Sequence, residues 1–185
     1  MEKTDIWPVI HAERKALAAD LQGLTDDQWS DASLCGRWTV RDVTAHMTAT
    51  AKITPPAFFA KLAASGFKLE RLQDKDIAVQ RGSSPADTLA RFEAVVTSVK
   101  HPPGPVESWL GETIVHSEDI RRPLGIRHEY PADAVRRVAD FYAGSNLIIG
   151  AKRRIDGLTL RATDAPGPTA AGRRRPAPSC RWSWP

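Results

Sequence analysis

The sequence has little cysteine, few aromatic residues and no long apolar run. Its two cysteines, Cys35 and Cys180, are too few and too far apart among 185 residues for a disulfide framework, which favours a reducing cytoplasm. Charged residues or prolines interrupt every apolar stretch, and the start, MEKTDIWPVI, lacks the cationic and apolar parts of a signal peptide. We therefore expect a cytoplasmic protein that is neither secreted nor inserted into a membrane.

Acidic residues are absent from the last part of the chain, PGPTAAGRRRPAPSCRWSWP, residues 166–185. The whole chain has 26 Lys and Arg against 22 Asp and Glu, and four of the arginines lie in this tail. Residues 1–165 are therefore formally neutral. A nucleic-acid-binding domain normally carries its basic residues on the folded part, so we expect no nucleic-acid partner.

Apolar residues recur at helical spacing along most of the chain. Together with capping and stop signals, this spacing predicts helices at residues 4–22, 39–53, 58–72, 85–99, 107–124 and 131–149, and a short helical turn within 25–38. The alternating residues 157–163 predict a strand. Long helices with short connections predict a mainly α, up-and-down bundle. The expected domains are a bundle over residues 1–155, a strand-like element over 156–165 and an irregular Pro/Arg-rich tail over 166–185.

Two histidines, His46 and His116, interrupt apolar stretches of the predicted helices. Glu112 precedes His116 by four residues, which puts both side chains on one helical face, within roughly 6 Å at Cβ. Two imidazoles and one carboxylate can hold a divalent ion and leave a position open for water or substrate, as in catalytic zinc sites. With five histidines and 22 acidic residues, the same spacing also arises by chance. Hydrogen-bonded core histidines therefore remain an alternative.

The segments LCGRWTVRDVTAHM (34–47) and LGETIVHSEDIRRPLG (110–125) contain these candidate ligands. Both resemble signature regions of the mycothiol-dependent maleylpyruvate isomerase family, whose members are DinB-like metal-binding four-helix bundles of actinobacteria. The resemblance spans about residues 5–164, and after it the sequence departs from the family's apolar continuation. It implies a four-helix bundle in which His46, Glu112 and His116 are the metal ligands.

The resemblance also implies a zinc-dependent reaction between mycothiol and a small-molecule electrophile. Zinc would favour the thiolate of mycothiol or polarise a substrate carbonyl, so neither Cys35 nor Cys180 is needed as the nucleophile. Two other functions stay open: a metal-dependent hydrolase that uses a metal-bound water, and a non-catalytic metal-binding stress-response module. The sequence does not decide between a monomer and a homodimer.

Two further residues near the predicted ligands have two interpretations each, and a third has one. Asp119 lies one turn beyond His116 and can either orient its imidazole or form a surface ion pair. Arg122 can bind a substrate carboxylate or compensate the charge at the helix C-terminus. Cys35, in a loop before Trp38, is interpreted as a structural residue.

Overall fold

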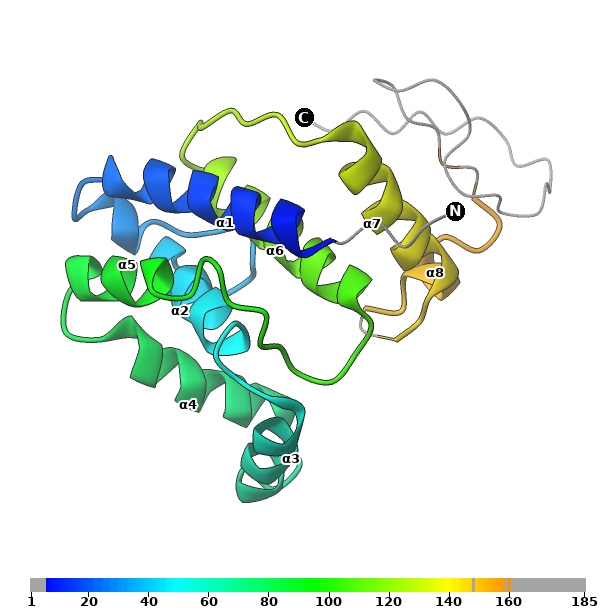
Figure 1. Ribbon diagram of the computed structural model, residues 1–185, viewed down its shortest axis with the longest axis horizontal. Coiled ribbons are helices and arrows are strands. Elements are labelled where there is room, and N and C mark those ends of the chain that lie inside the picture. Colours follow the sequence, from blue (N-terminus) through cyan, green and yellow to red (C-terminus); the bar gives the residue numbers. More distant parts are fainter. Residues whose placement is uncertain (1–5, 148, 159, 161–185) are drawn as a thin grey trace. The chain divides into compact units, whose positions relative to one another are not determined.

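The protein is described by a computed structural model that covers residues 6–147, 149–158 and 160. Within these residues the regular structure is helical and includes no strand (Figure 1). Contacts divide the chain into two compact units, Met1–Tyr130 and Pro131–Pro185, which are described separately below. None of the helices in the described part is both long enough and apolar enough to cross a membrane.

The first unit is a bundle in which α2 occupies the centre. Helix α2 packs against α4, α5 and α6, and α1 packs against α5 and α6 (Figure 1). This mainly helical arrangement agrees with the expected DinB-like bundle. Its elements are α1 (Trp7–Gln22), the 3-10 helix η1 (Gln28–Ser30), α2 (Val40–Thr50), α3 (Pro55–Ala64), α4 (Leu69–Arg81), α5 (Pro85–Glu93) and α6 (Val106–Arg121).

The core of this unit is formed by apolar side chains from α1, α2, α5 and α6 and from the turns beside them. Fully buried members include Leu17, Val43, Phe92 and Ile120. Burying one such side chain contributes about 1.5–3 kcal/mol relative to leaving it exposed. The core therefore holds together the two helices, α2 and α6, on which the predicted ligands lie.

The predicted helix over residues 58–72 is wrong, because two helices separated by a turn occupy this region. Helix α3 ends at Ala64, and α4 begins at Leu69. Gly66 and Phe67 between them have φ values of +67° and +58°. This left-handed backbone cannot continue a right-handed helix. The remainder of α4 is mostly polar, so the spacing of apolar residues does not predict it.

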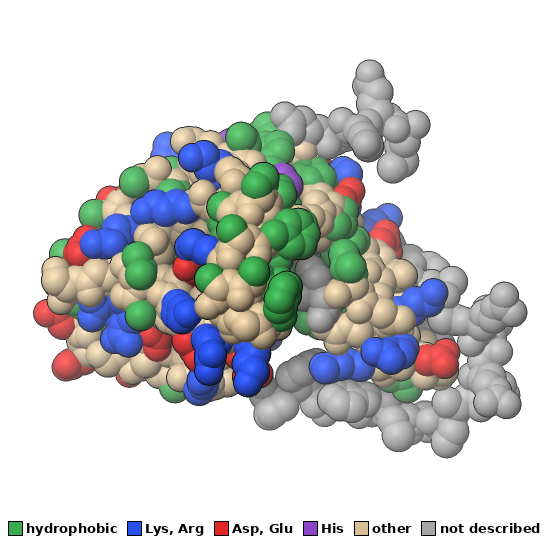
Figure 2. All heavy atoms as spheres, turned by 90° about the horizontal axis from the view of Figure 1, so that it is seen from below, with side chains coloured by type: hydrophobic (Ala, Val, Ile, Leu, Met, Phe, Trp, Pro, Cys, Tyr) green, Lys and Arg blue, Asp and Glu red, His purple; other side chains and the backbone are tan. Residues whose placement is uncertain are grey.

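Helix α3 exposes apolar side chains. None of its residues is buried, and the Phe59 residue is 58% exposed. Phe67, in the turn after α3, is 77% exposed. Figure 2 views the molecule from the side of α3, and hydrophobic side chains gather in the middle of that face. The helix therefore owes little stability to core packing.

The second unit contains α7 (Ala132–Gly144) and the short α8 (Ala151–Arg154), which pack against each other. Helix α7 ends earlier than the predicted helix over 131–149. Of the predicted strand, Gly157, Leu158 and Leu160 are described and form no strand. The rest of that strand and the predicted irregular tail over 166–185 lie outside the described residues. The predicted boundaries after residues 155 and 165 stay predictions.

Candidate functional site

The two predicted ligand histidines meet between α2 and α6. The ring centroids of His46 and His116 are 5.2 Å apart, with the rings edge to face. The indole of Trp38, just before α2, lies 4.9 Å from the His46 ring on centroids. The fold thus brings together two imidazoles that are far apart in the sequence.

Glu112 lies one helical turn before His116, and its two carboxylate oxygens differ in their contacts. Its Oε1 accepts a hydrogen bond from the Thr50 hydroxyl, which lies one turn after His46 on α2. Its Oε2 is buried, and no described residue donates a hydrogen bond to it. An unsatisfied buried oxygen costs roughly 1–3 kcal/mol, and a bound cation would remove that cost.

A buried arginine from α1 supplies positive charge near Glu112. Arg14 is 2% exposed, and its Nη1 donates to the carbonyl oxygen of Ser98 at 3.0 Å. Burial raises the pKa of the Glu112 carboxyl, and the charges of His116 and Arg14 and the Thr50 hydrogen bond oppose that rise. The sequence did not predict that Arg14 and Thr50 would lie beside Glu112. Arg14 interrupts the apolar stripe of α1, which was the available signal.

The two histidines differ in charge because their surroundings differ. Burial, together with the positive charge of His116, lowers the pKa of His46 to about 3. Burial also lowers the pKa of His116, but hydrogen bonds with Asp119 and Cys35 and the charge of Glu112 outweigh it and raise this pKa to about 10. Near neutral pH, His46 is therefore a neutral donor, whereas His116 must release a proton before it binds a metal.

The structure places Asp119 against His116 and Arg122 against Glu118. Asp119 Oδ2 accepts a hydrogen bond from His116 Nδ1 at 2.9 Å, since a carboxylate can only accept. Arg122 Nε donates to Glu118 Oε2 at 2.8 Å, and its side chain is 65% exposed. Asp119 therefore fixes the imidazole ring, whereas the contact seen for Arg122 is a surface ion pair.

Cys35 lies close to His116 and Asp119. Its interpretation as a structural residue did not predict this position. Among the described residues, donor atoms of Cys35, His116 and Asp119 all lie within 4.8 Å of one another. Among the same residues, the predicted set of His46, Glu112 and His116 does not form such a group. The sequence offered one indication of this role, the position of Cys35 in the same segment as His46. Spacing alone could not show that Cys35 lies beside His116 on α6.

The predicted ligands fit a divalent ion in donor type. His46 is neutral, Glu112 keeps a buried oxygen free, and the Asp119 contact leaves Nε2 of His116 as the nitrogen available for coordination. A carboxylate-bonded imidazole is the usual arrangement of a zinc-ligating histidine. The donor set therefore suits zinc or a similar ion.

A surface pocket of about 510 Å³ adjoins this cluster through Trp38. Its lining includes three basic side chains, Arg37, Arg41 and Arg81. Arg37 pairs with Asp74 and Arg81 with Asp42, so each acidic partner balances one of the arginines. The pocket offers room for a polar ligand beside the histidine pair.

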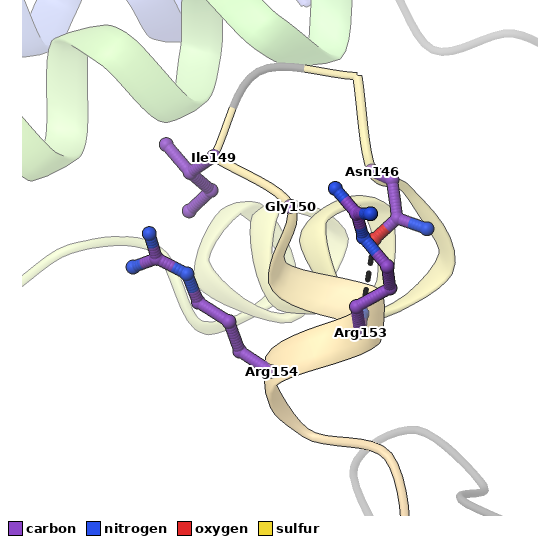
Figure 3. A pocket seen from close by; sticks show the side chains of 5 residues that line it. All are labelled: Asn146, Ile149, Gly150, Arg153 and Arg154. Carbon is purple, nitrogen blue, oxygen red and sulfur yellow. Dashed lines mark hydrogen bonds between the residues drawn. The ribbon is translucent and has the colours of Figure 1, made fainter.

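A second pocket, of about 430 Å³, lies in the second unit and contains none of the predicted site residues. It is lined by Asn146, Ile149, Gly150, Arg153 and Arg154 (Figure 3). Asn146 Oδ1 accepts a hydrogen bond from the backbone N–H of Arg153 at 2.9 Å. This bond stabilises the start of the short helix α8.

Residues 10–101 match the model of the mycothiol maleylpyruvate isomerase N-terminal domain. The chain belongs to this family. The matched stretch contains Cys35, Trp38 and His46 and ends before Glu112 and His116, so the match supports the first of the two signature regions directly. No curated protein and no solved structure matches the chain significantly.

Proposed function

We propose that this protein is a metal-dependent, mycothiol-dependent thiol transferase or isomerase of the maleylpyruvate isomerase type. The proposed ligands of the ion are His46, Glu112 and His116, and zinc is the favoured metal. The observation that carries the proposal is the contact between the two imidazole rings, one helical turn from a carboxylate whose buried oxygen has no partner among the described residues, in a chain of this family. The proposed substrates are mycothiol and a small electrophile with an activated double bond.

A bound zinc ion would supply positive charge that favours the thiolate form of the cosubstrate or polarises a carbonyl of the electrophile. The chain's own residues prepare the site. Asp119 holds the His116 ring through Nδ1. Thr50 holds Oε1 of Glu112, and burial excludes water from Oε2. The Trp38 indole covers the His46 ring and keeps it between the helices.

The reaction class needs no nucleophile from the protein. In an isomerisation of this type, the cosubstrate sulfur forms a bond to one carbon of a cis double bond, and a proton adds to the other carbon. Rotation about the resulting single bond follows, and loss of the other proton on the protonated carbon, together with the thiolate, restores the double bond in the trans form. The thiol is regenerated, so it acts as a cofactor. A transferase reaction would stop at the adduct.

The test is consumption of maleylpyruvate by the purified protein with and without mycothiol. We expect turnover only with mycothiol, and a loss in Glu112→Gln of more than about 100-fold, the upper range for removing a supporting hydrogen bond. Glu70→Gln is a matched control, because Glu70 is exposed on α4 and should keep full turnover.

Metal content gives an independent readout of the ligand assignment. His46→Ala and His116→Ala should each lose most of the metal found in the wild type. Equal metal in all three proteins would contradict the assignment. Turnover without any thiol would contradict the role of mycothiol and favour a hydrolase, in which water replaces the sulfur nucleophile.

A further inference from the structure

Cys35, His116 and Asp119 form a cluster of three metal-binding donors that the proposed function does not use as a set. Their donor atoms lie within 4.8 Å of one another. Thiolate, imidazole and carboxylate are all established zinc ligands. Neighbouring donors on a tetrahedral zinc ion lie roughly 3.5 Å apart, given bonds of about 2.1–2.3 Å. Small side-chain rotations would therefore bring the three atoms to coordinating distance.

The loop that carries Cys35 is held in place by hydrogen bonds of the Ser33 hydroxyl to its backbone and by a backbone bridge. Ser33 Oγ accepts the N–H of Cys35 at 3.0 Å and donates to the Trp38 carbonyl at 2.7 Å. An isolated bridge pairs Ala32 with Thr39 at the base of the loop. These contacts fix the backbone on both sides of the thiol, so its position is part of the fold.

One further bond ties this loop to the residue that provides the carboxylate. The backbone N–H of Leu34 donates to the carbonyl oxygen of Asp119 at 3.0 Å. Asp119 therefore contacts the loop through its backbone and His116 through its side chain. The side chains of His116 and Asp119 are 18% and 16% exposed. An ion can thus enter from solvent into a partly shielded site, where charge interactions are stronger than in bulk water.

We propose that Cys35, His116 and Asp119 form a second cation site, which binds a soft divalent ion such as Zn²⁺ or Cd²⁺ at the Nδ1 edge of the His116 ring. The sulfur donor favours such ions over Mg²⁺ and Ca²⁺. Binding replaces the hydrogen bond between His116 and Asp119, and the protons of the thiol and of Nδ1 pass to solvent. The site goes beyond the proposed function: the two sets of metal ligands share only His116, and Asp119 changes from holding the His116 ring to binding the ion.

Sharing His116 makes the two ion positions compete. A neutral imidazole keeps a proton on one nitrogen and offers the other as a donor, so binding through both nitrogens would require loss of both protons. An ion beside Cys35 therefore opposes an ion beside His46 and Glu112. The second site is expected to bind soft cations at the expense of the first.

The test uses Co²⁺, added to the metal-free full-length protein in thiol-free buffer, because cobalt bound to a thiolate shows a sulfur-to-metal charge-transfer absorption. The band should appear in the wild type, in Cys180→Ser and in His46→Ala, and it should be absent from Cys35→Ser. Cys180→Ser is the matched control, since it removes the other thiol. Asp119→Asn should keep the band and weaken Co²⁺ binding by about 10- to 100-fold, which tests the site without altering the cysteine.

Several results would overturn the proposal. They are Co²⁺ binding without the band in the wild type, persistence of the band in Cys35→Ser, and loss of the band in His46→Ala, which would place the sulfur on the ion of the first site. The absorption is read without turnover. If the band shows no cysteine site, mycothiol-dependent activity is still tested by its own assay. If the protein has no such activity, the band is still a test of the cysteine site.

Discussion

At the scale of single residues, the candidate site is defined by two partly buried histidines that differ in protonation. His46 lies under Trp38 and beside a positively charged ring, so its protonated form is disfavoured. His116 has Asp119 as a hydrogen-bond acceptor and Glu112 nearby, so its protonated form is favoured. In the metal-free protein, His116 on α6 therefore carries one positive charge. A divalent ion that binds its ring must displace a proton from it.

This asymmetry predicts the pH dependence of stability in the metal-free protein. The pKa of His46 is lowered from 6.5 to about 3, so below pH 6.5 the unfolded chain takes up a proton that the folded one does not, and stability falls as pH drops. The pKa of His116 is raised from 6.5 to about 10, so its contribution is complete below pH 6.5 and is lost as pH rises toward 10. The free energy of unfolding should therefore change with pH along two limbs, an acid limb below pH 6.5 and an alkaline limb above it. On each limb the change should be at most about 1.4 kcal/mol per pH unit.

Urea unfolding with a metal chelator, at intervals from pH 5 to pH 9, measures both limbs. His46→Gln should flatten the acid limb, and His116→Gln should flatten the alkaline one. If both variants kept the wild-type profile, the assignment of the two protonation states would be wrong.

Some residues of the candidate site could be predicted from the sequence, and others could not. The helical position of Glu112 relative to His116 followed from spacing, and the resemblance to the family singled out His46 as their companion. Arg14 and Thr50 face Glu112 only because α1 and α2 pack where they do, and Cys35 reaches His116 through a loop. Contacts between different helices depend on how the helices pack. The spacing of residues along the sequence does not reveal that packing.

At the scale of elements, a capping box explains where α2, the helix that carries His46, begins. Thr39 Oγ1 accepts the N–H of Asp42 at 3.2 Å, and Asp42 Oδ2 accepts the N–H of Thr39 at 3.0 Å, which is a capping box. Predicted starts were most accurate at such signals, including Ser84 before α5. Ends were less accurate, because α5 stops at Glu93 and Val95 remains buried in the following turn, which continues the apolar pattern without the helix.

The capping box gives a prediction for α2. Thr39→Ala should lower the free energy of unfolding by about 1 kcal/mol, since it removes the side-chain acceptor at the N-cap. Thr54 is the matched control, because it is the N-cap residue of α3 but makes no capping hydrogen bond. Thr54→Ala should change the stability much less. Equal losses in the two variants, measured by urea unfolding, would show that the Thr39 contact is not what stabilises the start of α2.

At the scale of the whole molecule, the residues proposed to bind the metal are concentrated in the first unit. The core cluster and all the proposed ligands belong to Met1–Tyr130. Near the end of this unit, the fully buried Arg121 pairs with Asp20 of α1 through a 2.7 Å contact. Its Nη1 also donates to the Tyr130 hydroxyl at 2.8 Å. A buried charge that keeps its partner is stabilised, whereas one that loses it costs several kcal/mol.

These contacts predict that residues 1–130 fold alone and bind the metal. The fragment keeps α6 with Glu112 and His116, and it keeps Asp20 and Tyr130 as the partners of Arg121. A fragment of residues 1–105 lacks α6 and should be unfolded, since it loses Ile120 from the core and the ligand pair. Circular dichroism, cooperative urea unfolding and metal content distinguish these cases. If residues 1–130 were unfolded and residues 1–155 folded, the boundary predicted from the sequence would describe the folding unit better than the division by contacts.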